Sequence, residues 1–232
     1  METFIGLIVI IAVFLLVQRL RFRSLVAAGQ ALGFTVTAGP TLEQRETWTE
    51  LARHVHSHVP TSWGPSAEGW VNGQPVRMQA QEIRRTINGN REWHTLVILD
   101  LANTALPAFT LQRSGGAPLL RQVMAPMVDP LVRALGGDPT PAAPGAGIAS
   151  IAADAAFCAR WQLSGTDTQA LEHFFDAATR AKILALELEG ELGGSGSTLA
   201  WLAPCALSSS QLPRLIEGAQ QLRAAFGGVQ IG

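Results

Sequence analysis

The chain contains few charged residues, and this shortage excludes several classes of protein. Of 232 residues, 15% are charged and 47% are hydrophobic, whereas a disordered chain carries more charge and fewer apolar side chains. The net charge of −1 provides no global basic field that could hold nucleic acid. Lys182 is the single lysine, so nearly all positive charge is arginine. We therefore expect an ordered globular body and no nucleic-acid partner.

Cysteines and nucleotide-binding motifs are equally scarce. Cys158 and Cys205 are far apart and form no C-x-x-C pair, which excludes a disulfide scaffold and a zinc knuckle. We expect two free thiols that pack as small apolar groups. The chain also lacks the G-x-x-x-x-G-K-[ST] phosphate loop and the G-x-S-x-G nucleophile motif. The sequence thus predicts no cofactor, and it leaves the catalytic residues, if any, unknown.

An unbroken apolar run opens the chain. Residues 4–17 read FIGLIVIIAVFLLV, which covers roughly 21 Å as a helix and is shorter than the ~30 Å core of a bilayer. Residues 18–22 extend the segment to roughly 28 Å, because Gln and Arg can direct their polar ends to the interface. A cleaved signal peptide and a buried core helix are the alternatives, but positive charge before the run and a cleavage site after it are lacking. We expect residues 1–23 to form a transmembrane anchor that contacts lipid through residues 4–22.

The arginines that follow this run predict its orientation. Arg19, Arg21 and Arg23 lie immediately C-terminal to the apolar residues, and cytoplasmic flanks of membrane helices carry the excess of Lys and Arg. We therefore interpret these three arginines as membrane-flanking residues. The sequence predicts a protein of the bacterial inner membrane, with the N-terminus outside and the body in the cytoplasm.

The pattern after the anchor predicts an α+β fold, in which antiparallel β hairpins or a meander pack with amphipathic helices. A short helix at 24–33 is expected to stop at Gly33. Thr41 and Gln44 form a capping box before a helix at about 42–58. Asn72-Gly73 and Asn88-Gly89 are typical of tight β hairpins.

Strands are expected on both sides of a loop rich in proline, glycine and alanine. The apolar residues at 93–101 predict a central strand, and 108–112 a further one. The loop at 136–147 is a linker or a long surface loop. We therefore expect an α+β unit with a β meander at 24–135 and a second α+β unit at 148–232.

The second unit alternates between strand and helix signals. Residues 156–165 predict a strand, and Thr166 or Asp167 then caps a short helix. Residues 182–190 alternate in polarity and predict a strand that returns at 198–204 through a glycine-rich turn. Residues 212–226 form the most regular amphipathic helix of the chain.

Three histidines at alternate positions raise the question of a metal site. On the helix expected at about 42–58, His54 and His58 share one flank, whereas His56 points about 160° away. His54 and His58 are thus candidate ligands for a metal. Catalytic zinc usually needs a third protein ligand, and protonated imidazoles also suit the negative end of a helix dipole. The second explanation is favoured, so the sequence predicts no metal site.

The remaining titratable residues offer material for an acid–base site only if the fold brings them together. His94, Asp100 and His173, with the His54/His58 pair, are the candidates for such a site. Asp100 lies in an apolar strand, where it would need a partner such as Arg84 or Arg85.

Alternating glutamates form a separate pattern. Glu187, Glu189 and Glu191 could share one face of a strand. Paired carboxylates can raise one another's pKa for acid–base chemistry. The leucines between them favour instead the solvent side of a half-buried hairpin.

Three stretches resemble a family of bacterial membrane-anchored α+β proteins without an assigned activity. These stretches are LPAFTLQRSG, AFCARWQLSGTDTQALEHFF and the LELEG…TLAWL hairpin. Phe157, Trp161 and Leu163, followed by Asp167, match the aromatic strand and Asp-capped helix of that pattern. The resemblance covers roughly residues 1–226. It implies a membrane segment before an α+β domain and no catalytic residues.

These observations favour a single-pass, membrane-tethered protein whose body is a non-enzymatic interaction or scaffolding domain. Its partner would be a protein of unknown identity, in addition to the lipid bilayer. Two alternatives stay open. One is an enzyme whose site forms only in three dimensions, and the other is a peripheral lipid-binding module.

Overall fold

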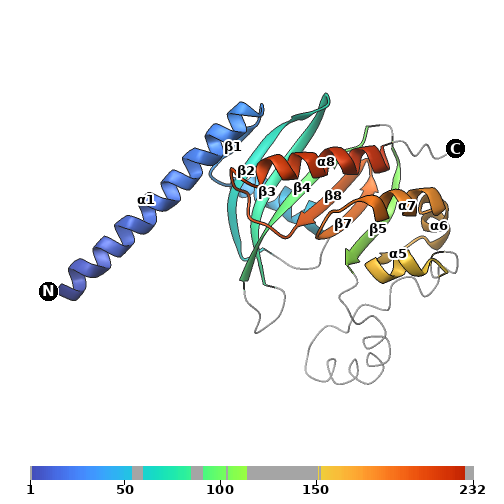
Figure 1. Ribbon diagram of the computed structural model, residues 1–232, viewed down its shortest axis with the longest axis horizontal. Helices are drawn as coiled ribbons and strands as arrows, with labels where there is room; N and C mark the ends of the chain where they lie inside the picture. The colour runs from blue at the N-terminus through green and yellow to red at the C-terminus, as the bar shows by residue number, and fades with distance from the viewer. Residues whose placement is uncertain are drawn as a thin grey trace, which may run out of the picture.

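The fold is α+β, as the sequence predicts, and it is built on one eight-stranded antiparallel sheet. The computed structural model describes residues 2–53, 60–84, 91–102, 104–113, 151 and 153–227. The strand order is β1-β2-β3-β4-β8-β7-β5-β6, and Figure 1 shows the sheet with helices packed against it.

The first four strands form an antiparallel meander. The predicted meander is confirmed only from the second of these strands to the fourth, because the strand expected at 108–112 does not pair with the fourth. They are β1 (Thr35–Thr37), β2 (Ser62–Val71), β3 (Gln74–Arg84) and β4 (Arg91–Asp100). The hairpin at Asn72-Gly73 is confirmed, because both residues have positive φ angles, of 52° and 74°, as a type I′ turn requires. Asn88-Gly89 lies outside the described residues. Strand β4 is central, as predicted, and Leu96, Val97 and Leu99 on it are fully buried.

The other four strands do not simply continue the meander. They are β5 (Leu106–Arg113), β6 (Trp161–Gly165), β7 (Glu191–Gly196) and β8 (Thr198–Ala203). Strand β8 pairs with β4. The hairpin of the last two strands in the chain, β7 and β8, therefore lies between β4 and β5 in the sheet. Strands from both predicted units therefore share one sheet. The boundary at 136–147 lies outside the described residues, and the division into two units stays a prediction.

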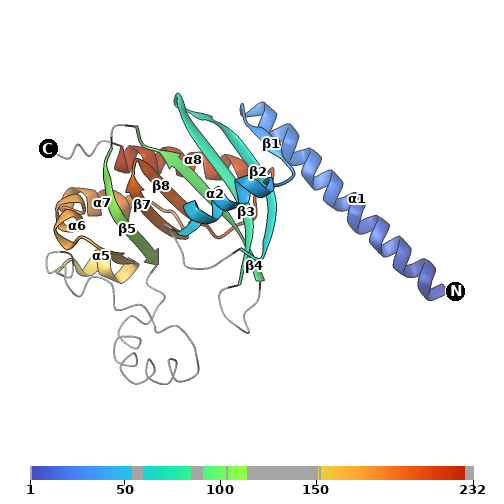
Figure 2. The ribbon, with the colours of Figure 1, turned by 180° about the vertical axis from the view of Figure 1, so that it is seen from behind.

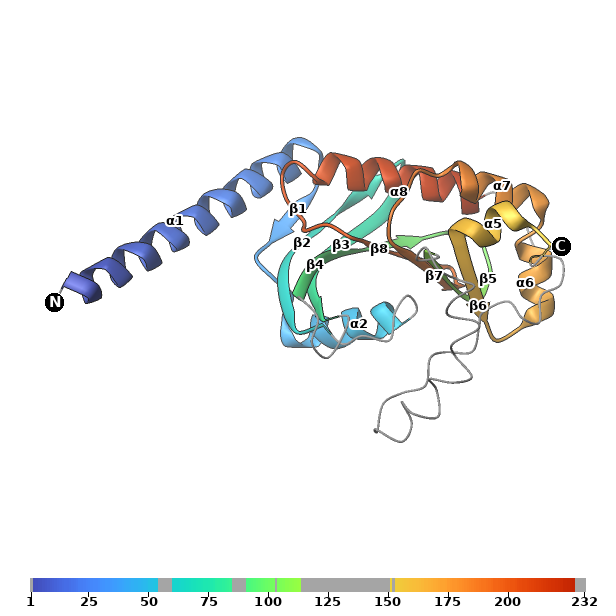
Figure 3. The ribbon, with the colours of Figure 1, turned by 60° about the horizontal axis from the view of Figure 1, so that its bottom comes forward.

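Helices cover the two faces of this sheet unequally. Figure 3 shows α8 (Leu212–Phe226) and α7 (Ala177–Ala185) over one face and α2 (Leu42–Arg53) under the other. The shorter helices α5 (Ala155–Arg160) and α6 (Thr168–Phe174) lie on the α8 side. The main core fills the space beneath α8, where the ring of Phe109 contacts Phe174, Phe175 and Phe226 at centroid distances of 5.0–6.2 Å. A smaller core lies beneath α2, which Figure 2 shows from behind.

Several helix ends follow the local signals in the sequence. At the start of α2, the Thr41 N–H donates to Gln44 Oε1 at 2.9 Å, and the Gln44 N–H donates to Thr41 Oγ1 at 3.3 Å. The capping box is thus confirmed. Asp167 caps α6, because its Oδ1 accepts the N–H of Ala170 at 3.0 Å. The amphipathic helix expected at 212–226 is α8.

One predicted strand is confirmed only in its second half, and another was wrong. Residues 161–165 of the strand expected at 156–165 form β6, whereas residues 156–160 belong to helix α5, because Asp154 Oδ1 accepts the N–H of Phe157 and caps its first turn. Residues 182–185 of the strand expected at 182–190 belong to α7, which Asp176 caps in the same way. Residues 186–190 belong to no strand, although Leu186 has extended dihedral angles. In both cases, an apolar pattern too short to distinguish period two from period 3.6 allowed the error.

Helix α1 runs from Glu2 to Ala31 and is about 45 Å long. Its last turns pack on the body, since Leu25 is 2% exposed and Ser24 Oγ donates to Ser209 Oγ at 3.0 Å. Its N-terminal part projects away from the sheet (Figure 1). The predicted stop at Gly33 is confirmed, because its φ of +76° turns the chain and Phe34 donates back into the last helical turn.

The projecting part of α1 exposes its apolar side chains. Ten large hydrophobic residues between Leu7 and Val17 are between 38% and 68% exposed. Arg19, Arg21 and Arg23 then interrupt the apolar sequence. Within the part of the chain that the structure describes, no helix is both long and apolar enough to cross a membrane. The predicted transmembrane helix at residues 1–23 is therefore not supported by the described residues.

Candidate functional site: a groove beside helix α8

The acid–base candidates of the sequence are dispersed over the fold. His94 and Asp100 both lie on β4. They are six positions apart, and a strand rises about 3.3 Å per residue, so their Cα atoms are about 20 Å apart. His94 is buried at 1% exposure, whereas Asp100 is exposed. His173 is exposed on α6, which packs over the face of the sheet opposite to α2. These three residues do not form one site.

The ion pair predicted between Asp100 and Arg84 does not form. Strand register places Arg84 opposite Arg91, at the far end of the β3–β4 hairpin from Asp100. Arg85 lies outside the described residues. A different arginine approaches Asp100: Arg223 of α8 donates to its backbone carbonyl at 3.3 Å. Burial lowers the pKa of the Arg223 guanidinium, and the charge of Asp100 partly opposes that effect.

The metal candidates cannot be placed. His54 and His58 lie outside the described residues. Within the described ranges, no group of three or more His, Cys, Asp or Glu residues could hold a metal ion.

The glutamates at 187–191 occupy a different setting from the predicted strand. Glu187 and Glu189 are exposed in the extended segment between α7 and β7, and Glu191 is half-buried at the start of β7. Leu186 and Leu188 alternate with them and are buried. The alternation of polarity is therefore real, although the backbone of residues 186–190 pairs with no strand. Glu187 and Glu189 lie at the edge of a groove.

This α8 groove separates the segment at 187–189 from helix α8 and has a volume of about 370 Å³. Its floor is apolar and its rim is polar. The residues that line it are Glu187, Leu188, Glu189, Trp201, Ala203, Pro204, Cys205, Gln211, Arg214, Leu215, Glu217, Gly218 and Gln221.

Side chains of neighbouring elements fix the wall that carries Glu187 and Glu189. The N–H groups of these side chains donate hydrogen bonds to backbone carbonyls that have no partner in a neighbouring strand. These bonds run from Arg160 to Leu184 and Leu186 (2.7 Å each), from Arg113 to Leu188 (3.1 Å), and from Trp201 Nε1 to Glu189 (2.8 Å). The segment is thus held in an extended form, with its carboxylates directed toward solvent.

The opposite wall is the side of α8 where the exposed Arg214 and Glu217 adjoin the buried Leu215 and Gly218. A side chain at Gly218 would come within 2.6 Å of the Trp201 ring, so glycine allows the helix to approach the floor of the groove closely. Arg214 and Glu217 are exposed on this wall, and Gln221 donates to Glu217 at 3.5 Å. The rim therefore carries three carboxylates and one guanidinium around an apolar floor.

Cys205 also lines the groove. Its carbonyl accepts a hydrogen bond from Thr95 Oγ1 at 2.8 Å, which ties the loop after β8 to the sheet. Burial raises the pKa of the Cys205 thiol, and the Thr95 hydrogen bond and Arg214 oppose that shift. A thiol with a raised pKa is a poor nucleophile at neutral pH, so the groove does not resemble the site of a cysteine enzyme.

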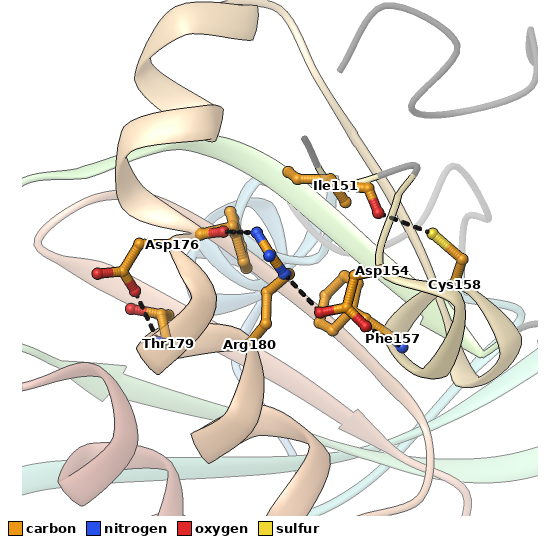
Figure 4. A network of polar contacts seen from close by, with 8 residues as sticks. Ile151, Asp154, Phe157, Cys158, Asp176, Thr179 and Arg180 are labelled. Atoms are coloured by element: carbon orange, nitrogen blue, oxygen red, sulfur yellow. Dashed lines mark hydrogen bonds and ion pairs between the residues drawn. The ribbon is translucent and has the colours of Figure 1, made fainter. Parts of the chain in front are cut away.

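A second polar cluster joins α5 and α7 (Figure 4). Arg180 Nε donates to Asp154 Oδ2 at 2.8 Å, and its Nη1 donates to the Phe175 carbonyl at 2.6 Å. The N–H of Phe157 and then Arg180 lower the pKa of Asp154. Burial and the nearby Asp154 charge raise the pKa of Cys158. Each of these contacts caps or links a helix, so we interpret the cluster as structural.

The sequence pattern does not predict the α8 groove. It predicts Glu187, Glu189 and Glu191 as one face of a strand. The other wall of the groove comes from residues 211–221, whose amphipathic pattern predicted only a helix packed on the sheet. The groove arises where two segments about 25 residues apart in the chain meet across β8.

Comparisons with known proteins provide a similarity of fold. No protein-family model matches the chain, and no curated protein matches it. A solved structure, the crystal structure of the mycobacterial trehalose monomycolate transport factor A, TtfA, matches with a TM-score of 0.51. The match covers 88% of this chain and 92% of TtfA, at 11% sequence identity. At that identity, the similarity establishes that the two chains share a fold.

Proposed function

We propose that the protein is a non-enzymatic interaction domain that helix α1 tethers to the bacterial inner membrane, with its body in the cytoplasm. The exposed apolar part of α1 carries this proposal. Ten large hydrophobic side chains between Leu7 and Val17 are exposed. Because successive helical residues point about 100° apart, this surface is apolar on every side. Lipid solvates such a surface from all directions, whereas a protein partner would usually cover only one stripe.

The flanking charges support the orientation. Arg19, Arg21 and Arg23 are exposed on α1 between the apolar part and the body. They would lie at the cytoplasmic surface if residues 4–22 enter the bilayer. The N-terminus would then lie outside, and Leu25 and the following residues would fix the body close to the membrane.

Two observations support a binding function for the body. The α8 groove has a volume of about 370 Å³ and joins a polar rim to a smaller apolar floor, and ligand sites in proteins are concave surfaces of this kind. The acid–base candidates on β4 and α6 are dispersed.

Membrane fractionation tests the tether. The full chain should stay with bacterial membranes after washes with high salt and alkaline carbonate. A variant that lacks residues 2–22 should appear in the soluble fraction and keep the circular dichroism of a folded α+β body. Recovery of the full chain in the soluble fraction would overturn the proposal.

Reporters at the two ends test the orientation. A C-terminal reporter that works only in the cytoplasm should be active, and its counterpart that works only outside should be silent. A tag at the N-terminus should be accessible from outside. An inaccessible tag would mean that α1 enters only the cytoplasmic leaflet, and it would contradict the proposed position of the N-terminus.

A further inference from the structure

The α8 groove has a chemical character that restricts what it can bind. Glu187, Glu189 and Glu217 place three exposed carboxylates on its rim, and Arg214 is the one cation among its lining residues. The buried residues Leu188, Trp201 and Leu215 contribute apolar surface to its floor. A complementary ligand therefore carries positive charges at its edges and apolar groups between them. The same charges repel anionic lipid headgroups and nucleic acid.

The groove is also formed in advance. The Trp201 ring is held by its hydrogen bond to the Glu189 carbonyl and by close packing against Gly218. Arg160 and Arg113 hold the backbone of the extended wall. A site whose walls are already ordered loses little conformational entropy on binding. Ligand affinity can therefore come from the apolar floor and the rim charges together.

We propose that the α8 groove binds a short cationic and apolar peptide segment of an integral membrane protein, at its cytoplasmic side. This inference rests on the proposed function, which places the body beside the membrane in the cytoplasm. Cytoplasmic segments next to membrane helices are rich in Lys and Arg. Such segments combine basic residues with apolar neighbours, which matches the carboxylate rim and the apolar floor.

A defined peptide tests the charge complementarity. The probe is a fluorescent hexapeptide of alternating Arg and Leu, titrated into the full chain in neutral detergent micelles, with empty micelles as the blank. The peptide with Glu in place of Arg should not bind. Glu187→Gln, Glu189→Gln and Glu217→Gln combined should weaken binding roughly tenfold at low salt, since each exposed charge pair contributes modestly. Arg214→Gln should strengthen it about twofold.

The matched control lies on the opposite face of the sheet. Glu43, Glu46 and Glu50 are exposed on α2, and their combined replacement by Gln removes the same charge without touching the groove. This variant should bind the peptide with unchanged affinity. An equal loss in both triple variants would show that only net charge matters, and it would overturn the groove as the site.

Cysteine alkylation locates the bound peptide. Cys205 lines the groove, whereas Cys158 lies in the α5 cluster and donates to the Ile151 carbonyl. The peptide should slow alkylation of Cys205 several-fold and leave Cys158 unchanged. Absence of binding, or binding without protection of Cys205, would overturn the inference. Membrane fractionation does not depend on the groove, so the tether can stand when the groove fails.

Discussion

The two halves of helix α1 have similar apolar residues but different surroundings. Between Leu7 and Val17 the large side chains are at least 38% exposed, whereas Leu25 is 2% exposed and contacts the core. The N-terminal half is apolar all round, and the C-terminal half buries one side against the body. One continuous helix therefore has two different environments. The comparison teaches that exposure, and not hydrophobicity alone, distinguishes the projecting half of the helix from the half that joins the core.

The largest expected effect comes from charge in the exposed half. Ile10→Asp with Phe14→Asp should release most of the protein from membranes, because a carboxylate at the centre of a membrane helix costs about 3 kcal/mol. The melting temperature of the body should not change. Sedimentation of membranes and thermal unfolding in detergent measure the two quantities.

The same substitution in the docked half provides the contrast. Leu25→Asp should unfold the body, because it buries an unpaired carboxylate in the core. If Ile10→Asp with Phe14→Asp also lowered the melting temperature strongly, the two halves would not be independent and the comparison would fail.

A milder substitution measures how firmly α1 is docked. Leu25→Ala should lower the free energy of unfolding by about 2–4 kcal/mol, because it leaves a cavity between α1 and the core. The matched control is Leu20→Ala, at a position that is 54% exposed, and it should change stability by less than about 0.5 kcal/mol. Urea denaturation of the full chain in detergent would measure both. Equal effects at the two positions would contradict the docking of the C-terminal half.

The smallest effect concerns acid stability of the body far from α1. The Phe157 N–H and Arg180 lower the pKa of Asp154, and the Thr179 N–H lowers that of Asp176. A carboxyl with a lowered folded-state pKa stabilises the fold above its unfolded pKa, near 3.8, and loses that contribution as the pH falls through the folded value. The melting temperature should therefore drop between about pH 5 and pH 3.

Asp154→Asn isolates this contribution. The variant should melt lower than the parent at pH 7 and should lose less stability as the pH falls. Membrane association should be unaffected, since the cluster lies at the opposite end of the body from α1 (Figure 1). An unchanged slope of melting temperature against pH would show that the Asp154–Arg180 pair does not carry the acid sensitivity.

Local signals in the sequence predicted those elements that their own residues specify. The Thr41 capping box, the Asn72-Gly73 turn and the stop at Gly33 each depend on atoms within a few residues of one another. The central position of β4 followed from the apolar residues on both of its faces. The amphipathic pattern of α8 was long enough to identify a helix. Such elements need no knowledge of the remaining chain.

Elements with short or ambiguous patterns were assigned wrongly, because a missed local cap or a distant contact decided their structure. Residues 182–185 alternate like a strand, yet they continue α7, and Arg160 takes the carbonyls of Leu184 and Leu186. Asp100 lost its expected partner Arg84 because the register of β3 and β4 separates them. Periodicity over four or five residues does not distinguish these outcomes.

By itself, the sequence determined the α+β class, the apolar run before three arginines, and the helix ends at Thr41, Asp167 and Gly33, because each depends on composition or on neighbours in the chain. Only the tertiary structure decided that β8 joins β4, that α1 is half docked and half exposed, and that Glu187, Glu189 and Glu217 meet around one apolar floor. Those features require segments far apart in the chain to pack together. The free energy of that packing belongs to the whole fold and leaves no local mark in the sequence.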